Sequence, residues 1–356
     1  MHHAERKAYE KCQTAVRAQP DMPLTQPQRQ EHKKWRPPHF AWVFVLPYVE
    51  ASEWQVLCEV HVFFARLQAV WPPTQKMRLV LSGRRRIPAC TTEWFSPWRY
   101  VRQLRVQHGS LLYPLTNTDP QWLSNLRAFS LCEAGLEECH MTALHDLLHA
   151  MWTLDRLNLS GNDLSQVPLK AMLEAAEGSP QRHGARNLTL LNLSFCKLSE
   201  RLDASFLTLL PFLHHLDISY NNLQTSDVSA LFNYLGCASH LKELHLDGNE
   251  VGALESMQLL SKYLPLRCKK LVYLSINNNH IGDQGLAHLG SAISQLFCLR
   301  SLYMEDNIFS KEGILEFSDT IAAFQAVENF RIHISNRRLS VGLVLHLKHC
   351  FAAKAN

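Results

Sequence analysis

Residues 213–223 read LHHLDISYNNL, and the same spacing of apolar residues returns in LKELHLDGNEV (241–251) and LVYLSINNNHI (271–281). In each segment leucine or isoleucine occupies the first, fourth and sixth positions, and asparagine occupies the ninth. A pattern that recurs with a period of roughly 20 to 50 residues indicates stacked copies of one supersecondary unit. The chain is therefore predicted to be a repeat protein.

Further copies of L-x-x-L-x-L-x-x-N extend the series in both directions. Two are LDRLNLSGNDL (154–164) and LRSLYMEDNIF (299–309), and LTLLNLSFCKL (188–198) carries Cys196 where the others carry asparagine. Weaker copies begin at three positions, namely Val101, Leu126 and Val327. Leu79 and Leu81 fit the template loosely. The starting positions from 101 to 327 are separated by steps that average close to 28 residues.

Segments with helical periodicity lie between these copies. Apolar residues that recur three or four positions apart line one face of a helix, whereas alternation within L-x-L indicates a short strand. The helical sets are Val228, Leu231 and Leu235; Leu286, Leu289, Ile293 and Leu296; and Ile314, Phe317, Ile321 and Phe324. Each unit is predicted to be a strand followed by a helix.

These motifs resemble those of leucine-rich repeat proteins of the ribonuclease-inhibitor-like class, over roughly residues 100 to 340. The resemblance implies an α/β solenoid, a horseshoe with a parallel sheet on its concave side and helices on its convex side. The recurring asparagines are expected to be scaffold, because a buried amide can bond backbone groups where the chain leaves the strand. They are Asn162, Asn221, Asn249, Asn279 and Asn307.

The chain divides by composition into four parts. Residues 1–38 are predicted to form an extended basic arm, and residues 39–100 a divergent N-terminal cap or degenerate repeats. Residues 101–339 hold the leucine-rich repeats, and residues 340–356 are expected to cap the C-terminal end. The charge is uneven, because residues 1–125 carry 17 Lys and Arg against 9 Asp and Glu.

Motifs of enzymes and membrane proteins are not found. The chain contains no GxxxxGK[ST] phosphate loop and no GxSxG nucleophile elbow, and its ten cysteines form no CxxC pair. No apolar run approaches the length of about 20 residues that crosses a bilayer. We therefore expect a non-catalytic, intracellular and cytoplasmic protein that uses no metal, cofactor, small-molecule substrate or membrane.

The main functional prediction is a scaffold or adaptor that binds a protein partner through the concave face. Positions marked x in the repeat point outward from the sheet, so their side chains are free to contact a partner. The middle column of such positions is predicted to run from Arg105 to Arg331. The residues predicted to bind the partner are Asp217, Tyr220, Lys242, Glu243, His245, Asp247, Tyr273, Tyr303, Glu305 and Arg331.

Two alternatives rest on other residues. A structural subunit of an RNA-containing or cytoskeletal assembly would use a basic N-terminal region, in which cations neutralise phosphates and a tryptophan stacks on bases. Its candidate residues are Lys33, Lys34, Trp35, Arg36, Arg84, Arg85 and Arg86. A metal-dependent enzyme would use His145 and His149, which are four positions apart on a predicted helix.

Overall fold

The computed structural model describes residues 77–81, 101–116, 123–174, 184–199, 202–322 and 330–334. The predicted arm and C-terminal cap lie outside the described residues, as do all but residues 77–81 of the predicted N-terminal cap. The four-part division of the chain therefore stays a prediction.

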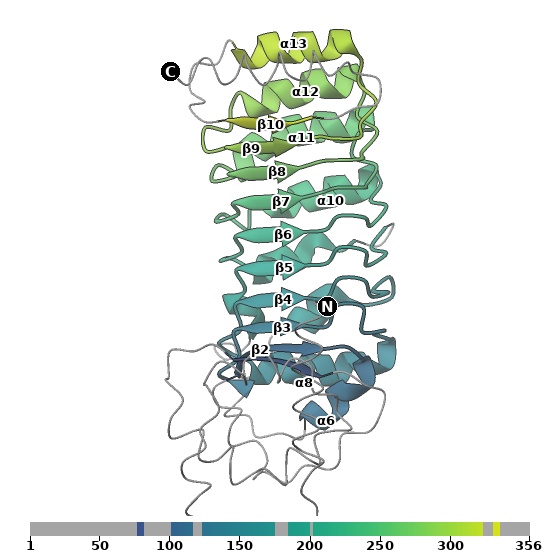
Figure 1. Ribbon diagram of the computed structural model, residues 1–356, viewed down its shortest axis with the longest axis vertical. Helices are drawn as coiled ribbons and strands as arrows, with labels where there is room; N and C mark the ends of the chain where they lie inside the picture. Colours follow the sequence, from purple (N-terminus) through teal and green to yellow (C-terminus); the bar gives the residue numbers. More distant parts are fainter. Residues whose placement is uncertain are drawn as a thin grey trace, which may run out of the picture.

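In the described residues, ten parallel strands form one open sheet in which every strand pairs with its neighbours in the sequence. Figure 1 shows the strands stacked as a column with the helices on one side. The strands are β1 (Met77–Leu81), β2 (Val101–Val106), β3 (Ala128–Ser130), β4 (Arg156–Asn158), β5 (Leu190–Asn192), β6 (His215–Asp217), β7 (Glu243–His245), β8 (Tyr273–Ser275), β9 (Ser301–Tyr303) and β10 (Arg331–His333). The predicted α/β leucine-rich repeat solenoid is confirmed.

The central leucine of each repeat sets the register of the sheet. Leu216 of β6 pairs with Leu244 of β7, which pairs with Leu274 of β8. These three side chains are fully buried. Since side chains alternate across a strand, the residues on either side of each leucine face away from the core. One apolar residue per short strand thus leaves two outward positions for other uses.

Helices cover the opposite side of the core. They are α6 (Leu112–Thr116), α8 (Met141–Ala150), α9 (Leu169–Leu173), α10 (Thr225–Leu235), α11 (Leu254–Arg267), α12 (Asp283–Ile293) and α13 (Lys311–Ala322). The predicted apolar faces of α10, α12 and α13 are buried against the sheet, as Leu231, Leu289 and Phe317 show. In the part of the chain that the structure describes, no helix is both long and apolar enough to cross a membrane.

The prediction of a helix in every repeat is wrong for the repeat between β5 and β6. Its described residues form only the 3₁₀ helix η6 (Ala204–Leu209). This repeat spans 25 residues from Leu188 to Leu213, which leaves too little chain for the longer helices seen from α10 onward. Phe206 and Leu207 of η6 fill the core in place of a helical face. Elsewhere in the described part of the chain, short 3₁₀ helices are η3 (Gly109–Leu111), η4 (Glu138–His140) and η5 (Gly184–Asn187).

The recurring asparagines form a buried ladder that ties each repeat to the one before it. Asn249 Nδ2 donates to the carbonyl oxygens of Leu246 (2.9 Å) and Ile218 (3.2 Å). Its Oδ1 accepts from the backbone N–H groups of Asn221 (3.1 Å) and Leu223 (3.0 Å) in the preceding repeat. One side chain thereby satisfies four backbone groups that lie beyond the strand ladder. The predicted scaffold role of these asparagines is confirmed.

Cys196 takes the asparagine position in its own repeat. Its Sγ donates to the carbonyl oxygen of Leu159, 3.3 Å away. Burial raises the pKa of the Cys196 thiol to about 12, so the thiol stays protonated at neutral pH and keeps its donor. A thiol cannot replace the accepting oxygen of an amide. The backbone N–H of Leu164, whose counterpart Leu223 donates to the amide oxygen of Asn249, instead donates to the carbonyl oxygen of Cys196, at 3.0 Å.

Candidate functional site

The concave face presents two columns of outward residues, one on each side of the buried leucines. Strand pairing places Asp217 beside His245 and His245 beside Ser275 in the second column. The first column contains His215, Glu243 and Tyr273, again on β6 to β8. The predicted middle column therefore matches the observed second column over these strands.

The last strand departs from the predicted alignment. Ile332 pairs with Leu302, so His333 lies beside Tyr303 and Arg331 lies beside Ser301. The placement of Arg331 in the middle column is wrong by two residues. The error arises because two alignments fit the alternation of the strand equally well, one with Phe330 and Ile332 facing the core and one with Ile332 and Ile334 facing it. A slip of two residues keeps every side chain on the same face of the sheet. Arg331 is exposed in the first column instead.

Five rings on β6 to β10 lie against one another and form what we call the ring ladder. It consists of His215, His245, Tyr273, Tyr303 and His333. The centroids of successive rings are 4.7, 4.7, 4.9 and 3.9 Å apart. The final pair is stacked, with 2° between the ring planes. The ladder crosses five strands. It alternates between the two columns from His215 to Tyr303, and His333 lies in the same column as Tyr303.

Sequence reasoning found three members of the ring ladder and missed two. His245, Tyr273 and Tyr303 were predicted to bind a partner, and the structure brings them together. His215 and His333 were not selected. His215 sits in the first outward column, and the strand register that the leucines provide could have aligned it with its neighbours. His333 was hidden by the slipped alignment of β10.

Carboxylates lie around His215 and His245, at the β6 end of the ring ladder. Glu243 Oε2 lies 2.7 Å from His215 Nδ1 across the strands. Asp247 accepts from the hydroxyl of Ser275 (2.6 Å) and the backbone N–H of Asn277 (2.7 Å). Asp217 accepts from Asn192 Nδ2 at 3.1 Å. The acidic residues are thus held in place by the sheet and its exit turns.

Burial changes the ionisation of the ladder rings. Desolvation, with a smaller contribution from the neighbouring His215, lowers the pKa of His245 below its usual value. Burial also raises the pKa of Tyr273. At neutral pH both rings are therefore held in their uncharged forms. His245 and Tyr273 thus present uncharged rings next to the carboxylates of Glu243 and Asp247.

A second aromatic feature lies where β5 and β6 leave the sheet. The rings of Phe195 and Tyr220 stack with centroids 4.4 Å apart and planes 6° apart, yet the residues are 57% and 43% exposed. Both have left-handed backbone angles, with φ of 57° and 56°. The equivalent turns use Gly161 and Gly248, which adopt this conformation at lower cost. Tyr220 was predicted as a contact residue, and Phe195 was missed.

The other predicted contact residues lie around the ring ladder rather than in it. Lys242 is exposed immediately before β7, and Glu305 lies half-buried in the turn after β9. The candidates for nucleic-acid contact, Lys33, Lys34, Trp35, Arg36, Arg84, Arg85 and Arg86, all lie outside the described residues. They stay a prediction.

The structure does not group His145 and His149 with a third ligand. His145 Nε2 lies 3.2 Å from the carbonyl oxygen of Glu174, and its Nδ1 lies 3.7 Å from Asp146. Among the described residues, two groups have three donor atoms close enough to share a metal ion. They are Glu137, Cys139 and His140, and His215, Glu243 and His245.

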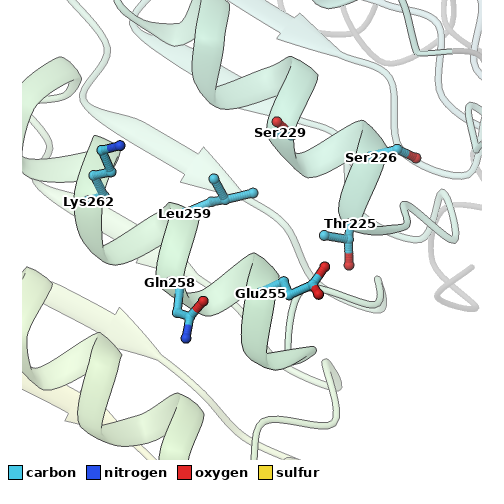
Figure 2. A pocket seen from close by; sticks show the side chains of 7 residues that line it. All are labelled: Thr225, Ser226, Ser229, Glu255, Gln258, Leu259 and Lys262. Carbon is cyan, nitrogen blue, oxygen red and sulfur yellow. The ribbon is translucent and has the colours of Figure 1, made fainter.

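A surface cavity of about 660 Å³ lies on the helical side, between α10 and α11. Figure 2 shows its lining, which combines hydroxyl side chains of α10 with the longer side chains of Glu255, Gln258, Leu259 and Lys262 on α11. Its two charged residues, Glu255 and Lys262, are seven positions apart on α11 and therefore two helical turns apart. This cavity does not gather groups suited to acid–base or nucleophilic chemistry.

Comparisons with known proteins agree with the repeat architecture. The family described as Leucine Rich repeat matches residues 210–232, 237–254 and 267–290. The chain is 25% identical over 56% of its length to Protein PAC2 of Saccharomyces cerevisiae, and 26% identical over 53% to ribonuclease inhibitor of Sus scrofa. It is 30% identical over 47% to Protein CARMIL of Dictyostelium discoideum. These matches cover 33%, 42% and 16% of the respective relatives, less than half of each.

A solved structure shows the same fold. The leucine-rich repeat-containing protein LegL7 from Legionella pneumophila aligns with a TM-score of 0.50 and 18% identity. The alignment covers 79% of this chain and 91% of that protein. The family matches and the stacked strands and helices show that the chain is built from leucine-rich repeats, and the porcine relative shows its similarity to the ribonuclease-inhibitor-like class.

Proposed function

We propose that this protein is a non-catalytic scaffold that binds a protein partner on the concave face of β6 to β10. The observation that carries the proposal is the ring ladder, an aromatic surface that spans five strands. Aromatic side chains are enriched among the residues that dominate binding energy at protein interfaces. The leucine-rich repeat fold is a general scaffold for protein interactions, and this surface is its best-equipped region here.

The rigidity of the sheet favours binding. Each ladder ring is attached to a strand whose backbone is fixed on both sides, except at the terminal strand β10. Rings held in register lose little conformational entropy when a partner docks. The same side chains on a mobile loop would have to be ordered at the moment of binding, at a cost of about 0.5–1.5 kcal/mol for each rotamer-rich side chain.

Charge favours a partner with a basic surface. The face and exit turns of β6 to β9 carry six acidic residues, which are Asp217, Glu243, Asp247, Glu250, Glu305 and Asp306. Acidic groups around an aromatic centre would steer a basic surface toward it and fix its orientation. The exposed stack of Phe195 and Tyr220 would extend the contact beyond β6. The name of the porcine relative, ribonuclease inhibitor, also describes action on another protein.

Affinity purification of the full chain, followed by quantitative mass spectrometry, tests the proposal. The double substitution Tyr273→Ala and Tyr303→Ala removes two adjacent rings that are half-buried on the face. We expect recovery of the main partner to fall at least about tenfold, because truncating a hot-spot residue costs about 2 kcal/mol or more. The substitution His245→Ala should also reduce recovery.

The matched control is Phe297→Ala. Phe297 is 68% exposed and lies in the turn between α12 and β9, so it is an aromatic residue outside the ring ladder. Its removal should leave partner recovery unchanged. Equal recovery with the folded double variant and the wild-type chain would refute binding through the ring ladder.

A further inference from the structure

We propose that His215, Glu243 and His245 form a binding site for a divalent transition-metal ion, with zinc as the best match. One ligand atom from each residue lies within 4.8 Å of the other two. Nothing in the repeat scaffold requires two imidazoles and a carboxylate at these outward positions. The proposal rests on this geometry and does not depend on the proposed partner binding.

The sheet explains why the three side chains meet. His215 of β6 and Glu243 of β7 are register partners, so they stand next to each other on adjacent strands. His245 follows two residues after Glu243 and therefore points to the same side of the sheet. Buried leucines on both strands fix the backbone beneath them, as Leu216 and Leu244 show. The donor atoms are thus positioned by the core rather than by a flexible loop.

The donor set suits zinc. Two histidines and one carboxylate are the protein ligands of one group of catalytic zinc sites, in which a fourth position stays open for water or substrate. Ligands bound to zinc at about 2.0–2.2 Å lie closer together than 4.8 Å, so a small rotation of the side chains would complete the site. The side chains of His215 and Glu243 are 22% and 50% exposed, so an ion from solution can reach them.

The surroundings of His245 provide independent support. Its Nε2 is buried and has no hydrogen-bond partner among the described residues. A buried nitrogen without a partner is costly, and ligation of a metal is one way to satisfy it. Asp217 is the register partner of His245, and Asp247 follows two residues after it. Their negative charges would offset the charge of a bound cation.

The other described group of donors has a structural explanation. The backbone N–H of Glu137 donates to His140 Nδ1 at 3.0 Å, and the two residues form a capping box at the start of η4. His140 is buried in this arrangement. Its Nδ1 is therefore already used to begin a helical turn, whereas His215 Nδ1 and Glu243 Oε2 lie 2.7 Å from each other and begin no helix.

Zinc titration of the full chain tests the site. Isothermal titration calorimetry, combined with metal analysis after dialysis, should detect a bound ion whose affinity depends on all three residues. We expect His215→Ala and His245→Ala each to weaken this binding at least about tenfold, and Glu243→Gln to weaken it in the same direction. Circular dichroism of each variant checks that the fold is kept.

Two control variants make the result specific. His280 and Glu250 form a similar pair, 3.6 Å apart, which belongs to neither described group of three donors. His280→Ala should therefore leave zinc affinity unchanged. Cys139→Ala, which removes the thiol of the other group, should also leave it unchanged. Zinc binding that survives both His215→Ala and His245→Ala, or that is lost with Cys139→Ala, would overturn the assignment, as would no detectable binding.

Discussion

The substitution Gly252→Ala is expected to lower the free energy of unfolding by about 3 kcal/mol, the upper part of the range for overpacking a rigid site. An added Cβ would collide with the carbonyl oxygen of Asn279 and would lie 2.6 Å from both the carbonyl carbon of His280 and the backbone nitrogen of Ile281. These are backbone atoms of the next repeat. They cannot move aside as the end of a flexible side chain can, so the two repeats must separate.

Gly282 supplies a matched control one repeat further along. Both glycines follow the apolar residue at the eleventh position of the repeat, Val251 in one case and Ile281 in the other. A Cβ at Gly282 would meet nothing within 4 Å. Gly282→Ala should therefore leave stability nearly unchanged. Chemical denaturation followed by circular dichroism compares the two variants, and equal stability would show that the repeats are not packed as closely as described.

The substitution Asn249→Ala is expected to cost about 3–4 kcal/mol, because a buried backbone group left without a partner costs about 1–3 kcal/mol. The change removes the acceptor of the backbone N–H groups of Asn221 and Leu223. Both groups lie in the interior at the exit from the sheet, whereas the carbonyl oxygen of Leu246 keeps Asn279 Nδ2 as a donor at 3.0 Å. Water will hydrate some of these backbone groups, so the loss in free energy of unfolding stays below the sum of their separate costs.

Removing the hydrogen bonds of Asn249 should also change the shape of the unfolding transition. Each repeat of a solenoid contacts only its neighbours, so weakening one interface reduces the coupling between the two sides. We expect a broader transition than in the wild-type chain. Asn233→Ala is the control, because Asn233 is exposed on α10 and outside the asparagine ladder. A stability loss no larger than that of Asn233→Ala would contradict the scaffold role of Asn249.

The sheet could be predicted from the sequence because its determinant is local and repeated. A central apolar residue in each short strand, leucine in all of β4 to β9, is followed by a buried amide in most of these repeats. This pattern fixes where each strand begins, which side faces the core and which strand lies next. The pairing of Leu191, Leu216 and Leu244 is this pattern in three dimensions. Connecting segments are less constrained, because both a helix and η6 can bury apolar residues against the sheet.

The candidate site was predictable only in part. Outward positions follow from the register, so His245, Tyr273 and Tyr303 could be selected from the pattern alone. The contacts between rings of the two columns could not be predicted, since they depend on how each side chain rotates above the sheet. The metal-ligand spacing of His145 and His149 was visible within one helix, whereas His215, Glu243 and His245 become neighbours only when two strands pair.

Radical footprinting of side chains, with the captured partner bound and absent, tests binding at the concave face most directly. The modification rates of Tyr273, Tyr303 and His333 should fall several-fold in the complex, while exposed residues of the helical side, such as Leu266 and Leu315, react as before. This pattern would place the partner on the ring ladder. Protection confined to α10 to α13, with the ladder rings still reactive, would contradict the account.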